Sequence, residues 1–162
     1  MKISLLEAIE KAQEKIKNTP KEHLRRLACL DKLKLLRKRG LVDETVYLVD
    51  DQGNLEVDYL VIDYMMGELN DWDIQKKKSK LFVMELKSIL SCNSCVEKDP
   101  SCLDFHHLNP KDKEFSIAVA TNSGFSIKRI IEEIKKCVVV CSNCHRKEHQ
   151  KSKIMALDSS CL

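Results

Sequence analysis

Cysteines and histidines in the second half of the chain are of the types that bind metal ions, and they are spaced as ligands. Two Cys-x-x-Cys pairs begin at Cys92 and Cys141, and an adjacent histidine pair lies between them. Two further histidines, four residues apart, follow the second cysteine pair. The residues with ligand chemistry are Cys92, Cys95, Cys141 and Cys144, together with His106, His107, His145 and His149. Their number and order predict two metal sites, one structural and one catalytic.

The four paired cysteines are assigned to a structural zinc ion. Each Cys-x-x-Cys turn presents two thiolates from one tight loop, and two such turns complete a tetrahedral site. Zn²⁺ suits four soft ligands at about 2.3 Å. A redox role fits less well because two pairs are present rather than one. The metal would also hold together a module whose own core is too small to be stable.

The histidines predict a second metal ion, since four of the five in the protein are concentrated here. His145 and His149 are four residues apart, so they face the same way on a helix that begins at the second cysteine pair. His106 and His107 are adjacent, so they point in opposite directions on a strand. One of these two can therefore join the metal while the other stays free beside it. A free imidazole titrates near neutrality and can act as a general base.

The elements that must position these residues are predicted from apolar periodicity and turn residues. Amphipathic helices are followed by a β-hairpin, and the lysine-rich segment 70–80 is interpreted as a junction between two units. A further helix leads directly into the first cysteine pair. The predicted helices span residues 3–17, 21–39 and 80–90, and the predicted strands span 46–49 and 55–62. The expected class is α+β, with an N-terminal helical and hairpin domain (1–79), a zinc-stapled domain (80–152) and a C-terminal tail (153–162).

The composition is that of a soluble globular protein. Of 162 residues, 33% are charged and 43% are hydrophobic, which argues against disorder. No apolar run approaches the roughly 20 residues needed to span a bilayer, so no membrane partner is expected. The N-terminus lacks the apolar region of a signal peptide. Four of the eight cysteines are arranged as metal ligands, which favours a reducing compartment, so an intracellular location, in the cytoplasm or nucleoid, is expected.

Charge is strongly segregated within the first half of the chain. Residues 11–39 hold 11 Lys/Arg and 3 Asp/Glu, a net charge of +8, whereas residues 40–73 hold 10 Asp/Glu and no Lys or Arg. The basic stretch could bind nucleic acid. Alternatively, the acidic segment of the same domain neutralises it.

Several segments of the second half resemble the HNH nucleases. They are Leu103–Pro110, Lys113–Ile117, Glu133–Cys137 and Cys141–Arg146. The closer likeness is to the branch whose ββα-metal finger is flanked by two zinc knuckles. The resemblance covers about residues 80–150, and residues 1–79 match no family that we recognise.

The resemblance implies hydrolysis of DNA phosphodiester bonds with one catalytic divalent ion. It implies that His106 is a metal ligand, that His107 is the general base, and that His145 and His149 are further ligands. Asp104 matches a carboxylate position in some members and would orient a histidine. Three imidazoles favour Zn²⁺, Ni²⁺ or Mn²⁺, although Mg²⁺ or Mn²⁺ could support turnover. DNA is the expected partner, and a virus or mobile element is one expected source.

The sequence departs from the family pattern at one position. The middle asparagine, which usually supports the loop carrying the general base, has no clean counterpart, and Lys135-Lys136 occupies roughly its place.

Two alternative functions stay open. The first is a non-catalytic zinc module that binds nucleic acid or protein, and it differs at His107, since such a module has no use for an unligated histidine. The second is a carboxylate-metal nuclease using Glu85 and Lys87 with Asp58 or Asp63, although Glu85 and Lys87 are expected on a helix.

Overall fold

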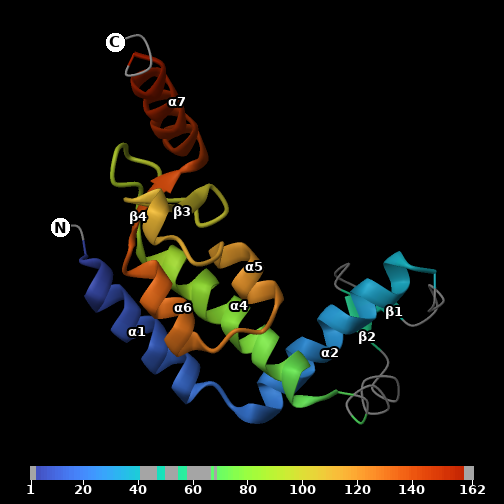
Figure 1. Ribbon diagram of the computed structural model, residues 1–162. Coiled ribbons are helices and arrows are strands. Elements are labelled where there is room, and N and C mark those ends of the chain that lie inside the picture. The colour runs from blue at the N-terminus through green and yellow to red at the C-terminus, as the bar shows by residue number, and fades with distance from the viewer. Residues whose placement is uncertain (1–2, 41–46, 50–54, 58–66, 68, 159–162) are drawn as a thin grey trace.

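The computed structural model describes residues 3–40, 47–49, 55–57, 67 and 69–158 (Figure 1). Within these residues, helices alternate with two antiparallel strand pairs, which confirms the α+β class. In chain order the elements are α1 (Leu5–Asn18), α2 (Lys21–Lys38), β1 (Tyr47–Val49), β2 (Leu55–Val57), α4 (Asp71–Ile89), β3 (Leu103–His107), a 3-10 turn (Pro110–Asp112), α5 (Ile117–Asn122), α6 (Ile127–Ile134), β4 (Cys137–Cys141) and α7 (Ser142–Asp158). None of the described helices is long and apolar enough to cross a membrane.

Helix α4 is the centre of the molecule, and α1, α2, α5 and α6 all contact it (Figure 1). Phe82 and Leu86 of α4 are fully buried. They belong to one apolar cluster with Ile9 of α1 and with Ile130 and Ile134 of α6. The N-terminal helix therefore shares its core with the second half of the chain.

The lysine-rich segment predicted to be a junction is helical instead. Asn70 caps the helix by accepting the Asp73 backbone N–H at 2.9 Å, and the Asp73 carboxylate accepts the Asn70 N–H in return. Ser79 is fully buried and donates its hydroxyl to the Phe125 carbonyl at 2.6 Å. Lys77 pairs with Asp31 of α2 at 3.0 Å. The expected boundary between residues 79 and 80 thus falls inside α4.

The first two helices lie close to their predicted positions. In α1, Ser4 and Glu7 form a capping box, and α2 is followed by Gly40 at φ +68°. Lys32 of α2 lies 3.9 Å from Asp73, so part of the basic charge of α2 meets an acidic residue of α4. Most of the acidic segment lies outside the described residues.

The predicted hairpin is present as β1 paired antiparallel with β2, with Val49 opposite Leu55. The predicted turn over 50–54 and residues 58–62 of the second predicted strand lie outside the described residues. The predicted C-terminal tail is helical as far as Asp158, since α7 continues to that residue.

The second strand pair carries the candidate site. In the antiparallel register of β3 and β4, Leu103 lies opposite Cys141 and His107 lies opposite Cys137. Helix α7 begins directly after β4, at Ser142, and extends away from the strand pair (Figure 1). This strand–strand–helix unit brings residues from both ends of the motif together.

Candidate metal centres

The four paired cysteines form one cluster that is positioned to hold a metal ion. The Sγ atoms of Cys92, Cys95, Cys141 and Cys144 all lie within 4.8 Å of one another. The Cys95 and Cys141 sulfurs are 3.7 Å apart. Sulfurs bound tetrahedrally at the zinc–sulfur distance stand roughly 3.8 Å apart, so the spacing suits zinc.

Backbone hydrogen bonds hold the first cysteine turn against β4. The Asn93 N–H donates to the Val139 carbonyl at 2.8 Å, and the Cys141 N–H donates to the Cys92 sulfur at 3.1 Å. Burial raises the pKa of the Cys92 thiol, but the N–H groups of Cys141 and Ser94 outweigh it and lower the pKa to about 6. The thiolate form of Cys92 is therefore favoured at neutral pH, whereas the hydrogen bond with the Cys141 sulfur raises the pKa of Cys144 to about 12.

Three histidines form the second cluster. His106 comes from β3, and His145 and His149 come from successive turns of α7. One ring nitrogen of each lies within 4.8 Å of the others, and the Nε2 atoms of His145 and His149 are 3.0 Å apart. Nitrogens bound to one ion at about 2.0–2.1 Å stand roughly 3.0–3.4 Å apart, so the spacing of His145 and His149 is that of two ligands of one ion. Burial, together with the charges of the other two rings, lowers the pKa of His106 and favours its neutral, ligand form.

Asp104 lies behind this cluster. It is two residues before His106 on β3, and its Oδ2 atom is 3.4 Å from Nδ1 of His145. The same oxygen accepts a hydrogen bond from the Ser142 hydroxyl at 3.1 Å. A carboxylate on Nδ1 directs Nε2 toward the other imidazoles, which is the contact expected of a residue that orients a ligand.

His107 lies outside the histidine cluster, but it is not free as the sequence suggested. Its side chain is 8% exposed, and its Nε2 atom lies 2.7 Å from Oε1 of Glu133. Glu133 was not expected from the sequence to contact His107. A signal was available, because Glu133 follows the apolar Ile130 by three residues and so lies on the same side of the helix as that buried residue.

Only part of the alternative carboxylate site lies within the described residues. Glu85 lies on helix α4, as expected, and pairs with Lys15 at 2.6 Å. Asp58 and Asp63 lie outside the described residues. The only metal-type groups found in the described part of the chain are the cysteine cluster and the histidine cluster.

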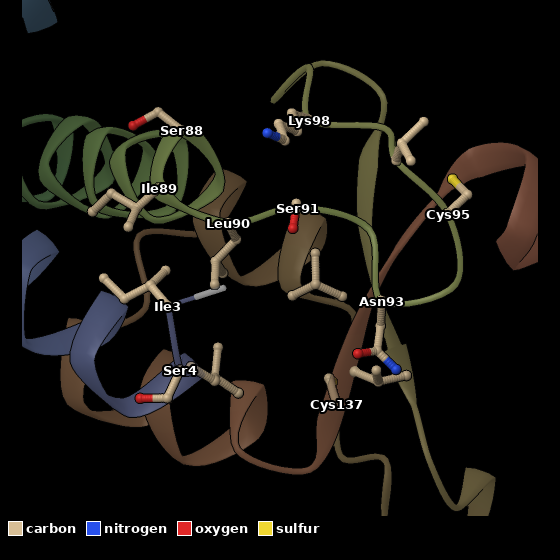
Figure 2. Close-up of a pocket in the computed structure, with 14 residues that line it drawn as sticks. Ile3, Ser4, Ser88, Ile89, Leu90, Ser91, Asn93, Cys95, Lys98 and Cys137 are labelled. Atoms are coloured by element: carbon tan, nitrogen blue, oxygen red, sulfur yellow. The ribbon is translucent and has the colours of Figure 1, made fainter. Parts of the chain in front are cut away.

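A groove of about 1100 Å³ lies between the start of α1, the end of α4 and strand β4 (Figure 2). Its lining is mostly apolar, with Lys98 and Cys95 at one side and Cys137 at the other. None of the clustered histidines lines this groove, so the candidate chemistry lies elsewhere.

Comparisons with family models, with curated proteins and with solved structures found no match to this chain.

Proposed function

We propose that this protein is a metal-dependent endonuclease of the HNH type that hydrolyses DNA phosphodiester bonds. The observation that carries the proposal is the division between neighbouring histidines of β3. His106 converges with two histidines of α7, while His107 is held apart by a different partner. A metal ligand adjacent to an unligated imidazole can supply both a bound cation and a general base for hydrolysis.

Each residue of the site has a separate role in this proposal. His106, His145 and His149 would hold the divalent ion, with Asp104 orienting His145. When bound, the ion supplies positive charge that stabilises the phosphate oxygens in the transition state. His107 removes a proton from the attacking water. The water oxygen then bonds to phosphorus, the bond to the 3′ oxygen breaks, and that oxygen takes a proton from solvent.

The cysteine cluster has a structural task in this proposal, as a zinc site. Cys141 and Cys144 flank the junction of β4 with α7, and Cys144 directly precedes His145. Zinc binding would therefore fix the start of the helix that presents two of the three imidazoles. Exposed Arg146 and Lys147 lie on the same helix and supply charge suited to a DNA phosphate.

Plasmid cleavage tests the proposal. Wild type, His107→Ala and the matched control His23→Ala, which alters an exposed histidine of α2, are compared in EDTA, Mg²⁺, Mn²⁺ and Ni²⁺. Wild type and His23→Ala should cleave with a divalent ion and not in EDTA. His107→Ala should lose about 10²-fold or more of the rate, which is the usual contribution of a general base.

Two results would contradict the proposal. Equal cleavage by wild type and His107→Ala would exclude His107 as the base. No cleavage with any metal, by protein that retains zinc and binds DNA, would instead favour the non-catalytic zinc module.

A further inference from the structure

We propose that Glu133 is the positioning residue for the general base, holding Nε2–H of His107 and leaving Nδ1 to take the proton. The inference rests on the proposed function of His107. It assigns to Glu133 a task that the sequence left without a residue, because the middle asparagine of the HNH pattern has no counterpart here.

The pair is buried, so its geometry is restricted. The side chain of Glu133 is 1% exposed and that of His107 is 8% exposed, and the two lie 2.7 Å apart. A carboxylate in such a position is costly unless several donors satisfy it. Here the Oε1 atom also accepts the backbone N–H groups of Glu114 and Phe115, at 2.8 and 3.3 Å.

Lys136 supplies the countercharge. Its Nζ donates to Oε2 of Glu133 at 2.8 Å, to Glu114 at 2.7 Å and to the Asp112 carbonyl at 3.2 Å. Burial alone would raise the pKa of Glu133, but the hydrogen bonds from Lys136, Glu114 and His107 lower it to about 2. Glu133 is therefore an ionised carboxylate, which can only accept hydrogen bonds.

The tautomer of His107 follows from this contact. Because Glu133 only accepts, Nε2 of His107 must carry the hydrogen, and in the neutral ring Nδ1 is then the lone-pair nitrogen. The described residues provide no hydrogen-bond partner to Nδ1. After Nδ1 takes a proton from water, the carboxylate balances the charge of the imidazolium, as in other carboxylate–histidine pairs.

The same residues hold the loop that follows the base. Glu133 binds the backbone at residues 114 and 115, and the Lys136 carbonyl accepts the N–H of Leu108 at 3.1 Å. The asparagine of the HNH pattern usually supports this loop. A purely structural role for Glu133 must therefore be separated from positioning of the ring.

Histidine-labelled protein makes this separation, because ¹⁵N correlation spectra distinguish the two imidazole tautomers. The variants are Glu133→Met, which removes the acceptor but fills the space, Glu133→Gln, which keeps one oxygen acceptor, and Glu114→Ala, which removes the exposed loop contact with Lys136 and leaves the contact of Glu133 with His107. Spectra are combined with kcat and KM for DNA cleavage and with zinc content.

We expect wild type, Glu133→Gln and Glu114→Ala to show the Nε2–H tautomer of His107, and Glu133→Met to show a mixture. The kcat of Glu133→Met should fall about 10²-fold with KM within about threefold, and Glu133→Gln should recover most of the loss. Zinc content should stay unchanged throughout.

An Nδ1–H tautomer in the wild type would overturn the inference, and this measurement needs no variant to fold. So would a Glu133→Met protein that keeps wild-type kcat, or a Glu114→Ala protein whose kcat falls as far as that of Glu133→Met. A wild type that cleaves nothing overturns the proposed function instead, because it removes the reaction rather than the positioning of the ring.

Discussion

The Nδ1 atom of His145 lies 3.4 Å from the Asp104 carboxylate, while its Nε2 atom lies 3.0 Å from that of His149. The His145 ring thus contacts the Asp104 carboxylate of β3 through one nitrogen and the His149 ring of α7 through the other. The two nitrogens of the ring have separate partners, so each can be tested separately.

Loss of the Asp104 carboxylate should lower the metal affinity of the histidine site without affecting the cysteine site. Asp104→Ala leaves Nδ1 of His145 without its carboxylate, and loss of such a partner typically costs 10–100-fold in metal affinity. Titration of Mn²⁺ or Ni²⁺ followed by calorimetry measures this, with Asp71→Asn, an exposed residue of α4, as the control. Unchanged affinity in Asp104→Ala would show that the contact does not support a ligand.

The cysteine cluster should hold one zinc ion per chain. Cys92→Ser removes a fully buried ligand, so this variant should lose the metal and much of its solubility. Cys102→Ser, a cysteine outside the cluster, should keep the metal. Zinc released by a thiol-blocking reagent and measured with a chromogenic chelator gives the stoichiometry. Full zinc content in Cys92→Ser would contradict the four-cysteine assignment.

The metal-type residues could be predicted from the sequence because their spacing is local. A Cys-x-x-Cys turn and a His-x-x-x-His helix bring ligands together within a few residues. For the adjacent His106 and His107, the alternation of side chains along a strand was enough to predict that they point in opposite directions. Glu133 could not be assigned in this way. It meets His107 only because β4 pairs with β3 and brings the end of α6 against that strand.

The segment over residues 70–80 is helical from Asp71 onward rather than a linker, and a different reason explains why the sequence did not predict this. A run of lysines was interpreted as a solvated linker, although lysine is a good helix former and Asn70 with Asp73 is a capping box. Lys77 and the buried Ser79 each have partners far away in sequence. Such tertiary contacts cannot be inferred from composition.

The shared core makes a quantitative prediction. Phe82 is fully buried in the cluster that joins α1, α4 and α6, so Phe82→Ala should lower the free energy of unfolding by about 3–5 kcal/mol. Met84, on the same helix, is 64% exposed, and Met84→Ala should change it by about 0.5 kcal/mol or less. Urea denaturation of zinc-loaded protein measures both. Similar values for the two variants would argue against the shared core.

Gly124, in the turn between α5 and α6, has nearly the same backbone angle as Gly40, which follows α2. Gly124 has φ +67° and Gly40 has φ +68°, a region that other residues adopt at a cost of roughly 1–2 kcal/mol. A Cβ on Gly124 would lie 3.1 Å from Nε1 of Trp72, whereas a Cβ on Gly40 would meet nothing within 4 Å among the described residues.

Gly124→Ala should therefore be the more destabilising of the two substitutions. Both variants incur the backbone cost, but only Gly124→Ala also disturbs the hydrogen bond from Trp72 Nε1 to the Ser123 carbonyl, which is 3.2 Å long. The net contribution of a hydrogen bond to stability is about 1 kcal/mol, so the unfolding free energies of the two variants should differ by an amount of that order. Trp72 is the single tryptophan of the chain, so its fluorescence reports directly on the turn. Equal losses of stability with unchanged emission would show that Trp72 does not constrain Gly124.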